Sequence, residues 1–380
     1  MTKIVLNTKD VLPILSVVAS VVNNKNAFPI LDCVRLETQK ERMALTTSDN
    51  ESWLTMYAPI VDGEQGFIAH INAKNLLQAL RNLGDKQVTL TFDETAMMVT
   101  CKYDNGEFNI PYIEDRDFPL PVEVNLESII INKEIQASKI KNAISSVECA
   151  TAQDEIRPIL NGVHFDFFAD GMVSVATDSR KMIKHKDLSV TSFTNGTVDN
   201  FTLSNKVSRI ILSLITNLED EGIKVISNEQ NVWFKCDYFS LTSRLIEGRY
   251  PNYDSVIPRD NDKIAIIDKS QFIAALKRVL LMGNPTSELV ILSFTNNRLD
   301  VSAEDIDFQK SASEFIDCTY SNEDFKIGFK GSVLLQLLTN ITGVYVKISM
   351  KDPSRAALVQ ENVQAEGIEY TSLIMPMRYD

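Results

Sequence analysis

The sequence predicts an α+β protein built from three copies of one domain. Three observations support this prediction: a residue pattern that recurs along the chain, the same order of strand and helix patterns in each copy, and proline-containing junctions between the copies. A chain of 380 residues has room for two to four domains of ordinary size. We place the domains at residues 1–125, 126–257 and 258–380, and call them the first, second and third repeats.

Two segments show the repetition most clearly, because they match at a constant spacing. Pro29-Ile30-Leu31-Asp32 precedes Thr47-Ser48-Asp49, and Pro158-Ile159-Leu160-Asn161 precedes Ala176-Thr177-Asp178 at positions 129 residues further along. A fainter third copy lies at 289–305. Triplication inside one chain favours a pseudo-symmetric assembly, of which a closed ring is one form.

Each repeat is expected to contain a short strand, a helix, a run of strands, a second helix and further strands. Apolar residues in 138–150 recur at the spacing of one helix face, whereas residues 87–92 alternate between apolar and polar side chains, as in a half-buried strand. Strand runs with two inserted helices predict antiparallel sheets. We expect the first helices at 9–22, 133–150 and 269–282, and the second helices at 73–83, 204–217 and 331–341.

The chain has a formal net charge of −13, which opposes broad contact with a polyanion. The six expected helices nevertheless contain eleven Lys and Arg against three Asp and Glu, a net of +8 that leaves −21 for the remainder. Helices that share one face would form a basic surface able to hold nucleic acid through its phosphates, without reading sequence. Alternatively these side chains only aid solubility, and charge alone does not separate the two interpretations.

Patterns typical of catalysis or of cofactor binding are missing from the sequence. The three histidines and five cysteines match no metal-ligand spacing, and no glycine-rich phosphate loop is present. Ser48-Asp49 and Thr177-Asp178 occupy equivalent repeat positions, which favours turn formation over catalysis. We therefore expect no catalytic residue, no metal and no cofactor. The chain also shows no signal peptide and no segment long enough to span a bilayer, which predicts a cytoplasmic protein without a membrane partner.

Four motifs taken together resemble the bacterial DNA sliding clamp family, the beta subunits of DNA polymerase III. They are Leu-Asn-Gly at 160–162, Val-Ala-Thr-Asp at 175–178, Glu-Gly-Arg-Tyr-Pro-Asn-Tyr at 247–253 and Met-Pro-Met-Arg at 375–378. The resemblance covers nearly the whole chain. It implies a ring-shaped homodimer of clamp domains, with helices lining the hole and antiparallel sheets outside. Such a ring is a processivity factor that encircles double-stranded DNA after loading by a clamp loader, and tethers the replicative polymerase and other proteins that carry a clamp-binding motif.

The resemblance also implies a peptide-binding pocket at the second and third repeats. Methionine side chains there suit varied ligands, although core packing would be the favoured interpretation without the resemblance. The pocket would be formed by Leu160, Thr177, Met182, Pro251, Val256, Ile374, Met375, Pro376, Met377 and Arg378. The chain departs from the family at Ser179-Arg180-Lys181, where Gly-His-Arg is commoner, and at the added Tyr379-Asp380. Both departures are expected to shift the peptide preference.

Contacts with DNA and with a second copy of the chain follow from the same resemblance. The DNA-binding positions would be Lys25, Lys74, Arg81, Gln153, Lys206 and Arg209. The dimer contact would pair a strand around Phe108 and Ile110 with a helix around Arg278, Leu281 and Met282.

Two other classes of function stay open from the sequence. One is a monomeric three-domain module that binds a peptide or polymer without encircling DNA, which the mass in solution would distinguish from a dimer. The other is an enzyme that acts on DNA, such as a nuclease, which needs metal-binding carboxylates that converge in space.

Overall fold

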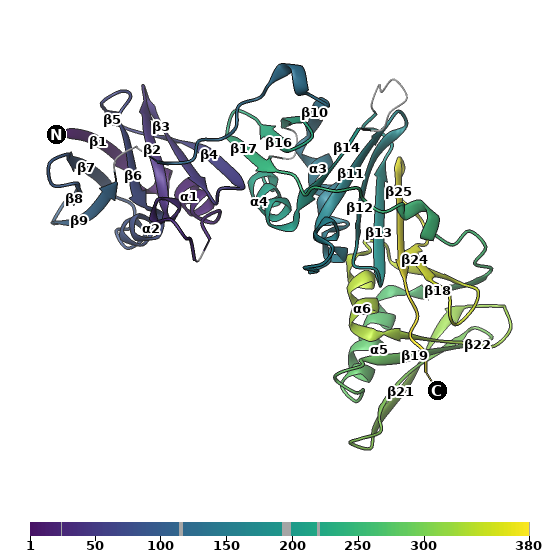
Figure 1. The fold of residues 1–380 in the computed structure, drawn as a ribbon. Coiled ribbons are helices and arrows are strands. Elements are labelled where there is room, and N and C mark those ends of the chain that lie inside the picture. Colours follow the sequence, from purple (N-terminus) through teal and green to yellow (C-terminus); the bar gives the residue numbers. More distant parts are fainter. Residues whose placement is uncertain (24, 114–116, 192–198, 219–220, 380) are drawn as a thin grey trace. The chain divides into compact units, whose positions relative to one another are not determined.

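A computed structural model of the chain describes residues 1–23, 25–113, 117–191, 199–218 and 221–379. The same order of elements occurs three times: a strand, a helix, three strands, another strand, a second helix and three more strands (Figure 1). The first repeat adds the two-residue strand β5. The predicted fold class, three α+β domains with antiparallel sheets, is thus confirmed.

The elements of each repeat have the following bounds. The first repeat contains β1 (Thr2–Asn7), α1 (Thr8–Ala19), β2 (Cys33–Gln39), β3 (Arg42–Ser48), β4 (Ser52–Pro59), β5 (Asp62–Gly63), β6 (Ile68–Asn72), α2 (Ala73–Arg81), β7 (Gln87–Asp93), β8 (Met98–Tyr103) and β9 (Gly106–Ile113). The second contains β10 (Ile131–Gln136), α3 (Ala137–Ser145), β11 (Gly162–Phe168), β12 (Gly171–Thr177), β13 (Lys181–Asp187), β14 (Asp199–Ser204), α4 (Asn205–Ile215), β15 (Gly222–Ser227), β16 (Asn231–Lys235) and β17 (Phe239–Arg244). The third contains β18 (Lys263–Asp268), α5 (Lys269–Leu280), β19 (Leu289–Thr295), β20 (Arg298–Asp305), β21 (Lys310–Thr319), β22 (Phe325–Lys330), α6 (Gly331–Asn340), β23 (Tyr345–Met350), β24 (Ala357–Glu361) and β25 (Ile368–Ile374).

The helix predicted at 133–150 is too long at both ends. Residues up to Gln136 belong to β10, where Ile131 and Ile135 are buried and their neighbours are not, the alternation of a strand rather than a helix. The helix α3 begins at Ala137, and residues 148–150 form a separate 3₁₀ turn. The basic character of the helices survives this correction. The six observed helices hold ten Lys and Arg and one acidic residue, Asp10.

The strands form two large antiparallel sheets, each inside one compact unit. The first unit contains Met1–Lys141 and Lys206–Leu245, with the strand order β10-β15-β16-β17-β4-β3-β2-β6-β9-β8-β7-β1-β5. The second contains Asn142–Asn205 and Ile246–Asp380, with the order β14-β11-β12-β13-β25-β24-β23-β18-β21-β20-β19-β22. The second repeat is therefore divided between the two compact units. The domain boundaries that the sequence predicts near residues 125 and 257 separate the repeats, not these units, and they stay a prediction.

Strand pairing across the repeat boundaries follows one rule. The third of the three strands after the first helix, β4 or β13, pairs antiparallel with the last strand of the following repeat, β17 or β25. The corresponding strand of the third repeat is β21, and the last strand of the first repeat is β9. Within the described residues, β21 has an unpaired edge over 310–317, and β9 has one over 106–111.

Two buried tryptophans fix the junction after the first repeat. The indole of Trp53 on β4 donates to the carbonyl of Pro119 at 2.9 Å, and that of Trp233 on β16 donates to the carbonyl of Val122 at 2.8 Å. Both rings are almost fully buried, so each donor needs such an acceptor. The proline-containing junction after the first repeat is thus anchored to the sheet of its own compact unit at Pro119 and Val122, and residues 115 and 116 lie outside the described residues.

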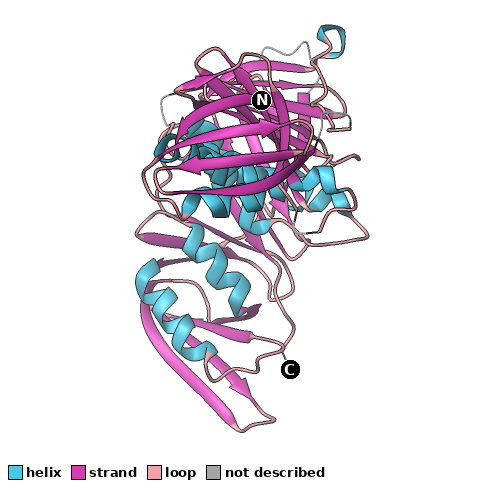
Figure 2. Ribbon diagram, turned by 90° about the vertical axis from the view of Figure 1, so that its left-hand side faces the viewer, coloured by secondary structure: helices cyan, strands magenta, loops and turns pink. Residues whose placement is uncertain are grey.

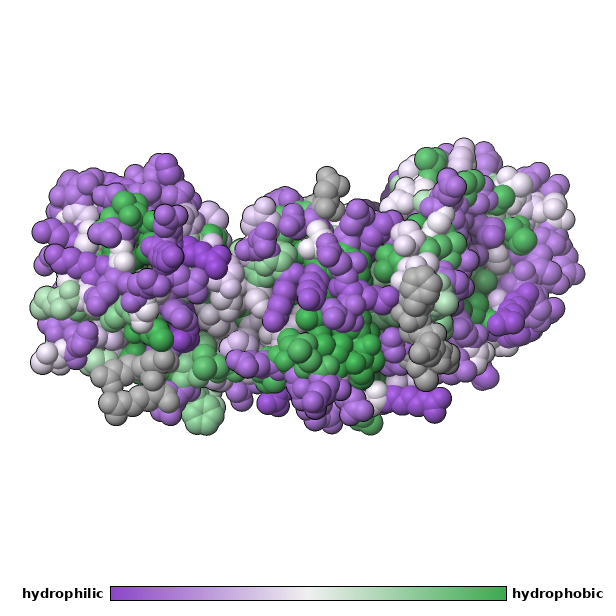
Figure 3. Space-filling model, turned by 90° about the horizontal axis from the view of Figure 1, so that it is seen from above, coloured by the Kyte–Doolittle hydropathy of each residue, from purple (hydrophilic) through white to green (hydrophobic). Residues whose placement is uncertain are grey.

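The helices of the third repeat cover one face of its sheets (Figure 2). Val290, Leu292 and Phe294 of β19 are buried on that face with Phe272 and Leu276 of α5, while alternate residues of β19 point to the other face. Most of the surface seen in Figure 3 is hydrophilic, with local apolar patches. Among the described residues, no helix combines the length and the apolar character needed to cross a membrane.

Candidate functional site

An apolar cavity of about 310 Å³ lies where β12, β13 and β25 meet the segment 250–256. This volume is within the usual range of ligand pockets. Its lining consists of Arg157, Ile159, Leu160, Thr177, Ser179, Lys181, Met182, Tyr250, Pro251, Asn252, Tyr253, Val256, Leu373 and Met375. All of these residues belong to the second compact unit. Arg157 and Lys181 are the charged residues of this lining, and each pairs with a carboxylate that is not part of it, Asp154 at 2.8 Å and Asp178 at 3.6 Å.

Strand register brings the floor of the cavity together. Thr177 is paired with Met182 between β12 and β13, and Met182 is paired with Leu373 between β13 and β25. These three residues therefore form one row across the sheet, with side chains on one face. Leu160, Met182 and Leu373 belong to a buried cluster that continues beneath the cavity. The floor is thus part of the hydrophobic core and is fixed before any ligand arrives.

Two tyrosines form a wall of the cavity and are anchored from behind. The Tyr253 hydroxyl donates to Asp166 Oδ2 at 2.6 Å, and the Tyr250 ring stacks on His164 at 4.3 Å between centroids. His164 Nδ1 lies 2.9 Å from the Thr202 hydroxyl. Burial, with the Asp166 hydrogen bond adding to it, raises the pKa of Tyr253 far above its ordinary value. The wall is therefore a neutral, pre-ordered aromatic surface.

Six of the ten pocket residues proposed from the resemblance line this cavity, and four lie elsewhere. Ile374 is buried on the opposite face of β25, because side chains alternate along a strand and its neighbour Leu373 takes the cavity position. Pro376, Met377 and Arg378 continue past the cavity. Met375 is held at the cavity by its N–H, which donates to the Arg180 carbonyl at 2.7 Å. Asp380, the last residue of the added pair, lies outside the described residues.

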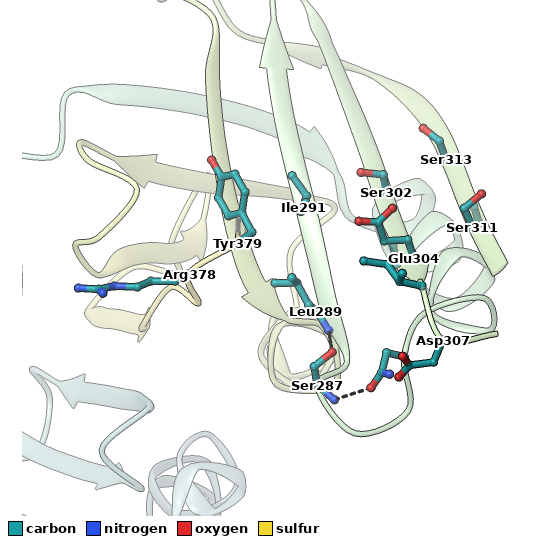
Figure 4. A pocket seen from close by; sticks show the side chains of 14 residues that line it. Ser287, Leu289, Ile291, Ser302, Glu304, Asp307, Ser311, Ser313, Arg378 and Tyr379 are labelled. Carbon is teal, nitrogen blue, oxygen red and sulfur yellow. Dashed lines mark hydrogen bonds between the residues drawn. The ribbon is translucent and has the colours of Figure 1, made fainter. Parts of the chain in front are cut away.

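The C-terminal segment runs from the cavity to a groove on the outer face of β19, β20 and β21 (Figure 4). The Met377 N–H donates to the Gly328 carbonyl at 2.8 Å. A Cβ at Gly328 would lie 2.9 Å from the Met377 carbonyl oxygen, so only glycine allows this approach. Tyr379 and Arg378 line the groove, whose volume is about 690 Å³, together with Leu289 and Ile291 of β19 and serines of β20 and β21.

The recurring Asp49 and Asp178 form turns, as their repetition predicted. Asp178 Oδ1 accepts from the N–H groups of Arg180 and Lys181, both at 2.8 Å. Asp49 Oδ1 accepts from the Ser52 N–H at 2.6 Å and from its hydroxyl at 2.8 Å. The prediction of turn formation at these positions is confirmed.

Lys206 was proposed as a DNA contact, but the structure uses its ammonium group internally. Its Nζ donates to the Val21 carbonyl at 2.8 Å, to Asn23 Oδ1 at 2.7 Å and to Asp49 Oδ2. Three acceptors match the three N–H donors of a lysine, so a direct phosphate contact would require breaking one of these bonds. Burial alone would raise the pKa of Asp49, but the bonds from Lys206 and Ser52 outweigh it and hold this pKa below its ordinary value.

Replacing Lys206 by Met should lower the free energy of unfolding by about 2 kcal/mol, because a buried carboxylate loses a charged donor. The folded-state pKa of Asp49 lies below the unfolded one. Its stabilising contribution is therefore complete above the unfolded pKa, near pH 4, and is lost as the pH falls through the folded value. Urea unfolding should show a difference between wild type and variant that shrinks on acidification. The matched control is Lys40→Met on an exposed turn, which should leave stability unchanged.

The other proposed DNA contacts lie on the surface. Lys74 and Arg81 are exposed seven residues apart on α2, and hence on one helix face. Arg209 is exposed on α4. Lys25 and Gln153 are exposed in loops, Lys25 before β2 and Gln153 after α3.

The proposed dimer residues lie beside the two unpaired strand edges. Leu281 and Met282 follow α5 and are 74% and 42% exposed, and Arg278 pairs with Glu314 of β21 through its Nε at 2.8 Å. Phe108 on β9 is half-buried. Ile110 is already covered by its own repeat, at 6% exposure, so its side chain contributes mainly to the core.

Sequence reasoning missed several residues that line the cavity. Tyr250, Asn252 and Tyr253 lie inside the 247–253 motif, so the motif itself was the available signal. Leu373 could have been found from alternation along its strand. Arg157 carried no pattern of its own. Among the described residues, no cluster of three or more His, Cys, Asp and Glu could hold a metal ion.

Family models of the DNA polymerase III beta subunit match the chain in three consecutive parts. The N-terminal domain matches residues 2–122, the central domain 134–252 and the C-terminal domain 254–378. The beta sliding clamp of Pseudomonas aeruginosa is 26% identical over 366 residues, which cover 96% of each chain. That of Haemophilus influenzae is 26% identical over 375 residues, covering 98% of this chain and 99% of the relative.

Solved structures of sliding clamps share the whole fold. The DNA polymerase III subunit beta of Pseudomonas aeruginosa superposes with a TM-score of 0.92 at 24% identity, covering 99% of this chain and 100% of that one. A sliding clamp of Bartonella birtlesii gives 0.92 at 23% identity, with both chains covered completely. The three matched domains leave only the termini and short junctions of this sequence unmatched. The chain therefore belongs to the family of DNA polymerase III beta subunits, the bacterial sliding clamps.

Proposed function

We propose that this protein is a processivity factor: a dimeric ring that encircles double-stranded DNA and tethers the replicative polymerase and other proteins to it. The observation that carries the proposal is the strand-pairing rule at the repeat boundaries. β4 pairs with β17 and β13 pairs with β25, which leaves β21 and β9 as the remaining pair of equivalent strands. Antiparallel pairing of β21 with β9 of a second copy, and the reverse, repeats the same junction and closes a ring of six domains.

A closed ring accounts for DNA binding by an acidic protein. Topological linkage retains the ring on duplex DNA without tight binding, so that weak phosphate contacts suffice and sliding stays possible. The helices carry ten Lys and Arg against one Asp, and of these the exposed Lys74, Arg81 and Arg209 are suited to line the hole. The acidic remainder of the chain repels DNA from the outer surface.

The apolar cavity is the proposed site for partner peptides. Its fixed floor, its aromatic wall and the adaptable side chains of Met182 and Met375 suit a short segment with apolar anchors. The protein has no catalytic part in replication and no cofactor. It acts in the cytoplasm, and a clamp loader opens it on DNA.

Retention on two forms of DNA tests the function. The protein is loaded onto nicked circular plasmid with a clamp loader and ATP, the complex is isolated, and the plasmid is then cut once. We expect the protein to stay on the circle and to leave the linear form, since only the circle traps a ring. Equal retention on both forms would show direct binding and would contradict the proposal. A monomeric mass in solution would favour the three-domain peptide-binding module instead.

Reversing the charge of Lys74, Arg81 and Arg209 to Glu should weaken association with DNA and make it less sensitive to salt. The slope of log K against log salt should fall by about 0.9 for each DNA phosphate that the variant no longer neutralises. Titration with a fluorescent duplex over a series of salt concentrations measures this slope. The matched control reverses Lys40, Lys102 and Lys224, which are exposed on strands or turns. A change of slope in the control instead of in the helix variant would place the DNA-binding surface elsewhere.

A further inference from the structure

Ser179, one of the chain's departures from the family pattern, has an unusual backbone conformation at the rim of the cavity. Its φ is 75°, in the left-handed region that disfavours residues with a Cβ. Its N–H donates to the Thr177 hydroxyl at 3.1 Å, within the turn closed by Asp178. The backbone of a serine is strained in this conformation, whereas that of a glycine is not. The hydrogen bonds of the Ser179 hydroxyl therefore bear on its role.

The Ser179 hydroxyl accepts a hydrogen bond from Nη1 of Arg157, at 2.9 Å. The same guanidinium donates to Asp154 Oδ2 from Nε at 3.0 Å and from Nη2 at 2.8 Å. Two opposite sides of the guanidinium group are thus fixed. Three of its five N–H groups are used within the described residues, and two are left for a ligand.

The loop that carries Arg157 is itself ordered by hydrogen bonds. Asp154 Oδ1 accepts from the N–H groups of Ile156 and Arg157, at 2.8 and 3.1 Å. Asn161 Oδ1 accepts from the Asp154 N–H at 2.8 Å, and Asn161 Nδ2 donates to the Asp154 carbonyl at 2.9 Å. The loop that carries the guanidinium is therefore already ordered, so ligand binding does not have to offset a loss of loop entropy.

The charges around the cavity define the ligand that this arrangement favours. Arg157 and Lys181 line it, whereas the carboxylates that pair with them, Asp154 and Asp178, do not. Lys181 is 7% exposed and already donates to Gln336 Oε1 at 2.5 Å. Arg157, with a side chain 53% exposed, is the cation with free donors at the entrance. Guanidinium groups recognise carboxylates through paired, charge-assisted hydrogen bonds.

We propose that Ser179 positions the Arg157 guanidinium at the rim of the cavity, so that the cavity selects peptides in which a carboxylate side chain accompanies the apolar anchors. The inference rests on the proposed peptide-binding function and names the ligand class of that site. Ser179 acts through Arg157 and is a positioning residue. Since the contact is at the surface, the expected preference is moderate, about fivefold in Kd for an acidic peptide over its amide counterpart.

The test uses labelled nine-residue peptides with two leucines and one phenylalanine, in which Asp or Asn stands at one polar position at a time. Fluorescence anisotropy with the full-length protein gives the ratio of the two Kd values at each position. Wild type should prefer Asp about fivefold at one position, and Ser179→Ala and Ser179→Gly should reduce this ratio to less than about twofold. Ser179→Asn should keep the preference, because asparagine tolerates a positive φ and its amide oxygen can accept from Arg157.

Thermal unfolding separates positioning from stability. Ser179→Gly should unfold at a higher temperature than Ser179→Ala, because glycine relieves the strain, while both variants lose the preference equally. A preference that persists in Ser179→Ala would overturn the inference, and so would equal binding of Asp and Asn peptides by wild type. In the latter case the peptide-binding function would still stand. If neither kind of peptide binds to wild type, that function fails, and the inference fails with it.

Discussion

Replacing Leu281 by Asp is expected to weaken self-association about a thousandfold while leaving the fold of the chain intact. Leu281 is 74% exposed at the end of α5, next to the unpaired edge of β21, so its own repeat gains little from the side chain. Burying a leucine against a second copy contributes about 2 kcal/mol. A closed ring of two chains contains this contact twice, and a total of about 4 kcal/mol corresponds to about three powers of ten in the dissociation constant.

Sedimentation equilibrium over a range of protein concentrations measures this effect. The control variant is Val363→Asp, since Val363 is 79% exposed in the loop after β24, a strand that β23 and β18 separate from β21. It should dimerise like wild type, and both variants should keep the wild-type circular dichroism spectrum; the unfolding temperature of Leu281→Asp is expected to fall, because association of the folded chains stabilises them. If Leu281→Asp dimerises normally, the edge of β21 is not the ring junction, and the pairing rule of the repeats does not extend to a second copy.

The repetition of the chain was readable from the sequence because it leaves residues at fixed offsets. The 129-residue spacing of Pro29 and Pro158, and the recurring Asp49 and Asp178, predicted equivalent strands and turns that the structure confirms. The start of α3 was misplaced. Lys133 and Glu134 are good helix formers, but pairing of β10 with β15 decides their conformation, and a contact between residues 90 positions apart is not visible in local periodicity.

Individual site residues were less predictable than the repeats, because their roles depend on distant partners. Lys206 was grouped with the DNA contacts by its charge, yet Asp49 and Val21 occupy its ammonium group, and both lie more than 150 positions away in the sequence. Ile374 and Leu373 differ by one position, and only strand register decides which of them faces the cavity. The role of Arg157 likewise depends on a distant partner, because its guanidinium is hydrogen-bonded to Ser179 in a different turn.

Removing residues 375–380 is expected to abolish partner-peptide binding without affecting the dimer. Met375 is the part of this segment that lines the cavity, and its N–H bond to the Arg180 carbonyl fixes it to the turn that also carries Ser179. Loss of one apolar wall and of this anchor should raise the Kd of a polymerase-derived peptide by more than about thirtyfold, or about 2 kcal/mol. Fluorescence anisotropy with the labelled peptide measures the Kd, and sedimentation measures the mass.

A shorter truncation shows which part of the segment matters. Removing residues 378–380 keeps Met375 and the bond from the Met377 N–H to the Gly328 carbonyl, which anchors the segment beyond the cavity. Because Arg378 and Tyr379 line the separate groove, this variant should bind the peptide like wild type. If both truncations bind normally, the cavity is not the peptide site. If the longer truncation dissociates the dimer, residues 375–380 stabilise the fold of the third repeat instead of binding the peptide directly. The bridge between Met377 and Gly328 of β22 would then account for this effect.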